Sequence, residues 1–151
     1  MNLEKLKEFR KHSECTKLDL SIKIGIPYST YFDKENGKTS FKLSEFIEII
    51  KALGLNKEEV FELLNLPLKH SYFEINIGDS IMDLKRLKKL RLEKRYTHKM
   101  LSSLLNMSVS SYSKREKGII DFKIDEFENL SKILELNEIE ILELLGLEYL
   151  T

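Results

Sequence analysis

The chain has 151 residues, of which 42% are hydrophobic and 33% charged, and its formal net charge is zero. This composition is typical of a protein with a buried core. No stretch approaches the roughly 18 apolar residues of a membrane span, and charged residues interrupt the N-terminal segment where a signal peptide needs an apolar run. We therefore expect a cytoplasmic protein with no membrane association. A single cysteine and three scattered histidines cannot form an internal disulfide or a zinc site, so we expect no metal and no cofactor.

An internal repeat organises the chain. When the sequence is shifted by 81 positions, residues 3–66 align with residues 84–147 without a gap, and 24 of the 64 pairs are identical. So many identities favour duplication over coincidence. The repeat predicts a first domain at 1–67, a linker at 68–80 and a second domain at 81–151. Each domain is close to the lower size limit for independent folding, so we expect the halves to support one another or a second chain.

The first helix of each copy is predicted from its apolar spacing. Leu3, Leu6 and Phe9 form one stripe along a helix, with charged residues opposite, and leucines repeat this spacing 81 positions later. This pattern predicts that the helix buries one face.

A second, short helix follows in each copy. Thr16 and Thr97 are predicted N-caps, because a threonine hydroxyl can accept a hydrogen bond from an unpaired amide of the first turn. The helix is predicted to end at Gly25 in the first copy and at Asn106 in the second. These residue types readily adopt the left-handed conformation at a helix end.

The third helix is predicted to follow a tight turn. It begins at Pro27 and reaches Glu35 in the first copy, with Gly37 closing it. In the second copy it begins at Ser108 and reaches Glu116. Proline suits the first turn of a helix, and serine suits an N-cap.

Two further helices complete each copy, at roughly 43–54 and 57–65, then 124–135 and 138–146. Their inward positions are predicted to be Phe46, Ile49, Leu53, Val60, Leu63 and the partners of these residues 81 positions later. The fold class predicted from these elements is all-α, with no sheet required.

The linker and the C-terminal segment each leave two alternatives. Residues 67–80 place Phe73, Ile75 and Ile77 at alternate positions, the period of a strand with one buried face. Such a strand would either pack across both domains or pair with a second chain to form a homodimer. The leucine-rich segment 139–150 would either finish the core or form a dimer seam through Leu142, Leu145 and Tyr149.

Two stretches carry a family resemblance. Thr16–Gly37 (TKLDLSIKIGIPYSTYFDKENG) and Thr97–Gly118 (THKMLSSLLNMSVSSYSKREKG) resemble the lambda-repressor-like, Cro/XRE-type helix-turn-helix family, and the resemblance extends over nearly 130 residues. Serines 21 and 102 stand where the family usually has alanine. The resemblance implies two tandem five-helix domains and two structural ion pairs, Arg10 with Glu35 and Arg91 with Glu116.

The resemblance also implies binding to double-stranded DNA as a transcriptional regulator, a repressor in our interpretation, with the third helix in the major groove. A lysine there can donate to guanine acceptors, serines can meet several base edges, and a valine can contact a thymine methyl. Reading positions of the second copy are expected to be Val109, Ser110, Ser113 and Lys114. Backbone contacts are expected from His98, Ser108, Lys117 and Lys123. His98 has the alternative of being plain exposed helix surface.

Charge distribution makes the second copy the expected primary reader. Residues 85–117 contain eleven Lys or Arg and two Glu, whereas residues 118–151 contain two Lys and nine acidic residues. A duplex is a polyanion and is attracted to the first of these segments. The alternative is that the basic segment is only the solvated face of a lysine-rich helix.

The first copy allows two interpretations. Its residues 2–38 contain eight Lys or Arg and six acidic residues, and its third helix exposes Tyr28, Phe32 and Asp33. Asp33 could accept from a cytosine amino group, or the two aromatic residues could contact a protein partner. Weaker DNA contacts are expected from Lys17, Tyr28, Ser29, Thr30, Lys34, Lys38 and Lys42.

The alternative function is a helix-turn-helix scaffold for protein binding, such as an inhibitor or a mobile-element regulatory partner. Enzymatic activity is not expected, because the sequence shows no combination of acid, base, nucleophile or phosphate-binding loop.

Overall fold

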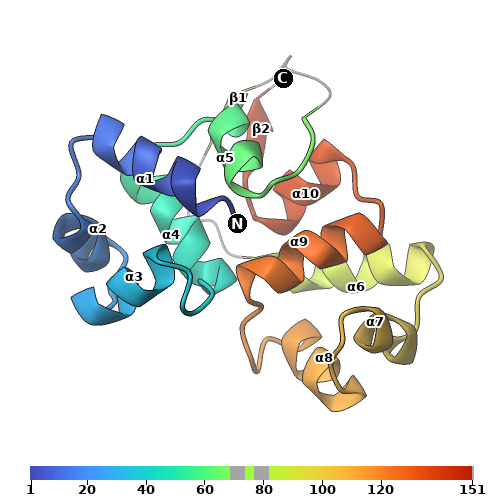
Figure 1. Cartoon of the computed structure of the whole chain (residues 1–151). Coiled ribbons are helices and arrows are strands. Elements are labelled where there is room, and N and C mark those ends of the chain that lie inside the picture. The colour runs from blue at the N-terminus through green and yellow to red at the C-terminus, as the bar shows by residue number, and fades with distance from the viewer. Residues whose placement is uncertain (69–73, 77–81, 151) are drawn as a thin grey trace.

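The computed structural model describes residues 1–68, 74–76 and 82–150, and in these ranges the chain forms ten α-helices and two three-residue strands. The first half contains α1 (Leu3–His12), α2 (Lys17–Lys23), α3 (Tyr28–Glu35), α4 (Leu43–Leu53) and α5 (Lys57–Leu63). After β1 (Glu74–Asn76), the second half contains α6 (Leu84–Glu93), α7 (His98–Leu104), α8 (Val109–Glu116), α9 (Ile124–Ile133) and α10 (Glu138–Leu144), followed by β2 (Glu148–Leu150) (Figure 1). The fold is all-α, as predicted.

Local capping explains where the short second helices begin and end. The Thr16 hydroxyl accepts from the amide of Asp19 at 3.1 Å, and Thr97 accepts from Met100 at 3.1 Å. Gly25 and Asn106 end these helices with φ of +71° and +53°. Both predicted caps and both predicted ends are confirmed. Pro27 differs in detail, because it is the N-cap residue before α3 and not its first helical residue.

The two halves contain the same helices in the same order. Each helix of the first half starts 81 residues before its counterpart in the second. The fourth and fifth helices end one or two residues earlier than predicted, at Leu53 and Leu63 in the first half and at Ile133 and Leu144 in the second. Apolar spacing continues past these ends because the residues that follow, including Leu64 and Leu145, are buried without being helical.

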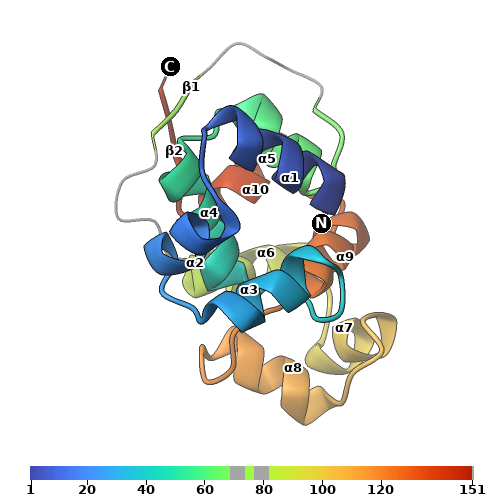
Figure 2. The same cartoon turned by 60° about the vertical axis from the view of Figure 1, so that its left-hand side comes forward.

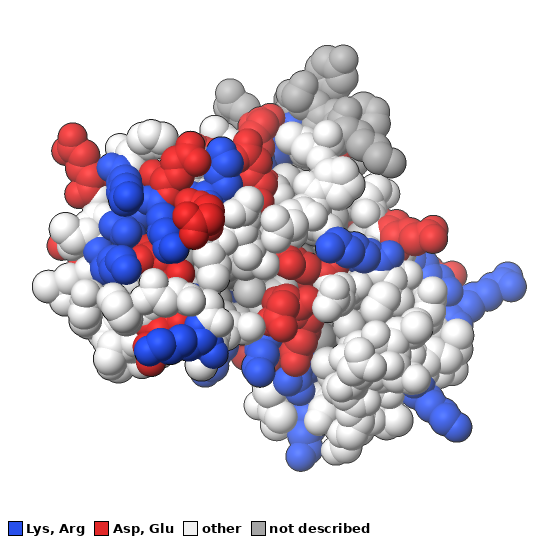
Figure 3. Space-filling model, viewed as in Figure 1, with Lys and Arg blue, Asp and Glu red and all other residues white. Residues whose placement is uncertain are grey.

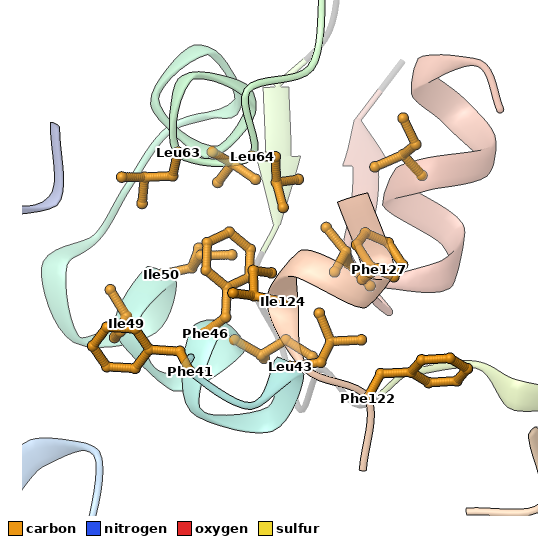
Figure 4. Packing of buried hydrophobic residues seen from close by; sticks show 14 of the residues in the cluster. Phe41, Leu43, Phe46, Ile49, Ile50, Leu63, Leu64, Phe122, Ile124 and Phe127 are labelled. Carbon is orange, nitrogen blue, oxygen red and sulfur yellow. The ribbon is translucent and has the colours of Figure 1, made fainter. Parts of the chain in front are cut away.

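One hydrophobic core runs through both halves. Helix α4 packs against α9, and Phe46, Ile50, Ile124 and Phe127 lie together at that contact (Figure 4). Of the predicted core residues, Leu53 is only half-buried. The C-terminal segment finishes the core through Leu142 and Leu145, both fully buried. Because the core is shared, each half stabilises the other, as expected from their small size.

The linker strand is present, but its partner lies in the same chain. β1 and β2 form a two-stranded antiparallel ribbon in which Ile75 faces Tyr149 across the strands. This ribbon corrects the expectation that no sheet is needed, while a homodimer formed through the linker stays a prediction. Phe73 and Ile77, the other residues of that alternating pattern, lie outside the described residues.

The third helix of each half lies on the side of that half that is away from the ribbon. Figures 1 and 2, which differ by a rotation of 60°, both show α3 and α8 as the lowest helix of their halves, with β1 and β2 at the top. In the described part of the chain, no helix combines the length and the apolar character needed to span a bilayer.

Candidate nucleic-acid interface

Helices α7 and α8 form a compact helix-turn-helix. They pack against each other, and the turn between them is closed by a hydrogen bond from the Met107 amide to the Ser102 carbonyl at 2.9 Å. Ser102 is buried where α7 meets its neighbours, and its hydroxyl donates to the Lys99 carbonyl at 3.0 Å. Ser21 repeats this arrangement in α2, donating to Leu18 at 2.7 Å. A serine whose hydroxyl donates to a carbonyl of its own helix can therefore take the place of a small apolar residue.

Glu116, the last residue of α8, is held by a buried network. Its carboxylate accepts from Arg91 Nε at 2.8 Å and Nη2 at 2.9 Å, and from the Tyr112 hydroxyl at 3.0 Å. His98 Nε2 lies 3.0 Å from the same carboxylate. Burial by itself raises the pKa of Glu116, but the hydrogen bonds from Arg91, His98 and Tyr112 outweigh it and hold that pKa below its ordinary value. The ionised network fixes the angle of α8 against α6.

The first half contains the matching network around Glu35. Arg10 Nε donates to its carboxylate at 2.7 Å, Lys17 Nζ lies at 3.0 Å and the Tyr31 hydroxyl donates at 3.0 Å. Both ion pairs implied by the family resemblance are thus present. Lys17 and His98, which we expect at the DNA backbone, occupy equivalent positions as half-buried partners of these glutamates.

The outward face of α8 is exposed and free of carboxylates. Val109 is 45% exposed, Ser110 and Lys114 are exposed, and Ser113 is half-buried. They lie on one side of the helix, since they are spaced at i, i+1, i+4 and i+5. The acid of this helix, Glu116, points inward. This face matches the positions expected to read bases.

The backbone positions expected around α8 are also at the surface. Ser108 caps α8 by accepting from the Ser111 amide at 3.0 Å, which leaves the neighbouring first-turn amides for an anion. Lys117 and Lys123 are exposed. Figure 3 shows Lys and Arg side chains at the lower end of the molecule, over α7 and α8, with acidic residues gathered higher up. This end therefore suits a polyanion.

The structure brings together two predicted contacts that are far apart in sequence. Lys42 and Lys123, the N-cap residues of α4 and α9, pair with each other in an antiparallel bridge and are both exposed. Nearby, Asp121 accepts from the Ser44 hydroxyl at 2.5 Å, and Glu126 pairs with Arg115 at 2.7 Å. The charge of Glu126 is compensated by Arg115, whereas Asp121, whose partner Ser44 is neutral, keeps its negative charge near the two lysines.

The corresponding face of α3 has a different chemistry. Tyr28 and Phe32 are 46% and 38% exposed, with their ring centroids 6.2 Å apart. Asp33 pairs with Lys38 at 2.8 Å, which satisfies both charges locally. Lys34, an expected DNA contact, is buried and donates to the Ser40 carbonyl, so it is not available at the surface.

Of the other positions expected on this face, Ser29 is exposed and Thr30 is half-buried. Sequence reasoning missed two apolar residues of α2, Leu18 and Ile22, which are 53% and 69% exposed beside these helices. The sequence could have indicated this exposure, because Leu18 and Ile22 share one face of the helix through their i, i+4 spacing, and that face is turned away from the buried Leu20.

Comparison with known protein families matches residues 87–141 to the family described as Helix-turn-helix, of the Cro and C1 type. The matched segment runs from α6 into α10 and includes the whole of α7 and α8. No curated protein and no solved structure matches the chain. Residues 87–141 are thus similar to a family of DNA-binding transcription regulators.

Proposed function

We propose that the chain is a transcriptional regulator that binds double-stranded DNA, that it consists of two tandem helix-turn-helix domains, and that α8 is its primary reader. Binding at a promoter or operator would repress transcription by blocking access of the polymerase. The observation that supports this proposal is the outward face of α8. It is exposed, carries Lys114 and no carboxylate, and belongs to the segment that matches the helix-turn-helix family.

The experiment selects bound fragments from random duplex DNA and then measures affinity for the selected sequence and for unrelated DNA at several salt concentrations. Lys114→Ala should lower the ratio of specific to unrelated affinity, because this lysine faces the bases. Lys123→Ala should weaken all sequences alike and reduce the slope of log K against log salt by about one unit.

Lys132→Ala is the matched control, because Lys132 is an exposed lysine in the last turn of α9, away from α8. It should leave both the selectivity and the salt slope at their original values. Selection of no sequence, together with equal small losses for all three variants, would contradict the proposal.

A second candidate function is protein binding through the first half. It is favoured by the apolar surface patch of Leu18, Ile22, Tyr28 and Phe32 on α2 and α3. Exposed apolar patches mark interaction sites, and a protein partner or a second copy of the chain would bury this one. Sedimentation of the chain alone tests whether two chains associate through this patch. If they do, Ile22→Lys should shift the dimer to a monomer.

A further inference from the structure

The two halves meet through contacts that exchange equivalent residues. The Leu43 amide donates to the Phe122 carbonyl at 2.8 Å, and the Ile124 amide donates to the Phe41 carbonyl at 2.9 Å. Phe41 and Phe122 are counterparts at the 81-residue offset, and so are Leu43 and Ile124. Lys42, between them, bridges to its own counterpart. Reciprocal contacts of this kind are the signature of a two-fold axis.

Two small cavities beside the bridge repeat the same relation. One, of 120 Å³, is lined by Leu3, Gly37, Phe41 and Asp125 among others. The other, of 290 Å³, is lined by their counterparts Leu84, Gly118, Phe122 and Ser44. Equivalent residues thus recur on both sides of the bridge, which extends the two-fold relation from the backbone to the surrounding side chains.

This internal axis relates α3 to α8. Each is the lowest helix of its half, on the side away from the ribbon (Figures 1 and 2), with the bridge of Lys42 and Lys123 joining the two halves. Two-fold related helix-turn-helix units read two half-sites of one duplex. Building on the proposed function, we infer that a single chain binds one bipartite duplex site, α8 on one half-site and α3 on the other.

The two half-sites differ in sequence, because the two reading faces differ in chemistry. Val109, Ser113 and Lys114 of α8 are replaced at the equivalent positions of α3 by Tyr28, Phe32 and Asp33. A lysine favours guanine acceptors, whereas the aromatic side chains favour thymine methyl groups. The carboxylate of Asp33 is engaged by Lys38, so the two aromatic residues set the preference of α3. The operator is therefore asymmetric, with a guanine-containing half under α8 and a thymine-rich half under α3.

Lys42 and Lys123 take the central position in this arrangement. They are exposed at the bridge, on the internal axis itself. The backbone between two half-sites passes closest to that axis, so these two lysines contact phosphates there and carry no sequence information.

The test uses the full chain and the duplex selected from the random pool. Native mass spectrometry should show one chain per duplex, and footprinting should show two protected segments centred about 10 to 10.5 base pairs, or a multiple of this, apart. Randomising either segment separately should weaken binding by about tenfold or more.

Specific variants assign each segment to a helix. Phe32→Ser gives α3 the serine that α8 has at the equivalent position, Ser113. This variant should relax the base preference only in the thymine-rich segment. Ser113→Ala is the reciprocal control, expected to act only in the other segment. Thermal melting of each variant checks that it remains folded.

The outcomes separate the inference from the proposed function. One chain protecting a single segment, with Phe32→Ser without effect on sequence preference, would overturn the inference while leaving α8 as a reader and assigning α3 to a protein partner. Two chains per selected duplex would overturn it as well. Failure to bind any duplex would refute the proposed function itself.

Discussion

Removing the Glu116 side chain should destabilise the protein strongly. Arg91 is 6% exposed, and two of its hydrogen bonds go to Glu116, at 2.8 and 2.9 Å. In Glu116→Ala its guanidinium keeps only the bond to the Tyr96 carbonyl, at 2.9 Å. Breaking a buried ion pair from one side costs about 3–5 kcal/mol. Both partners retain slight exposure, so we expect about 3 kcal/mol, which lowers Tm by about 6–12 °C in a chain of this length.

A double-mutant cycle followed by urea unfolding measures this effect. The cycle compares Arg91→Met, Glu116→Leu and the double variant. The double variant should be more stable than Glu116→Ala by more than about 2 kcal/mol, because no charge of the Arg91–Glu116 pair is then left buried and unpaired. Asp33→Ala is the control, because it breaks an exposed pair with Lys38 and should cost no more than about 1 kcal/mol. A loss below that value for Glu116→Ala, or simple additivity of the two single changes, would refute the reasoning.

Two further predictions concern a helix end and a buried acid. Gly118→Ala should cost about 2 kcal/mol in thermal unfolding, and Gly54→Ala about 1 kcal/mol. Both glycines have positive φ, but a Cβ at Gly118 would lie 2.9 Å from Leu84, whereas a Cβ at Gly54 would have no atom within 4 Å. Equal losses for the two variants would contradict this. Burial raises the pKa of Glu128, and the amino group of Met1 offsets part of this rise. The protonated form of Glu128 therefore stabilises the fold below the ordinary glutamate pKa of about 4.3, and this stabilisation is lost as the pH rises through the pKa of Glu128 in the folded protein. Glu128→Gln should therefore gain stability relative to the original chain between acidic and neutral pH, and a constant difference in unfolding free energy across that range would exclude the effect.

The caps and ends of the short second helices could be predicted from sequence because they depend on neighbours a few residues away. The Thr16 cap involves Asp19, and the helix end at Gly25 depends on one φ angle. Such interactions are complete within a single turn of the chain. The duplication was equally readable, since it is a property of the sequence itself. The two ion pairs at Glu35 and Glu116 followed from the family resemblance.

Tertiary structure decided which charged side chains reach the surface. Lys34 in the last turn of α3 is buried against Ser40 and Glu45, whereas Lys42, the N-cap residue of α4, is exposed. Likewise, Lys17 is half-buried and pairs with Glu35. Residue type gives the charge, but availability depends on partners brought close by folding.

Tertiary structure also decided which strand pairs with the linker strand and where the internal two-fold axis lies. An alternating pattern around Ile75 indicates a strand, but any strand with free backbone groups could pair with it, and in the folded chain that strand is β2. The sequence by itself determined two copies of one helical unit. Only their packing, through the reciprocal hydrogen bonds of Leu43 and Ile124, decided that α3 and α8 would both lie on the side away from the ribbon. The physical reason is that repeats specify local folding, whereas the geometry between them depends on surfaces that meet only after each has folded.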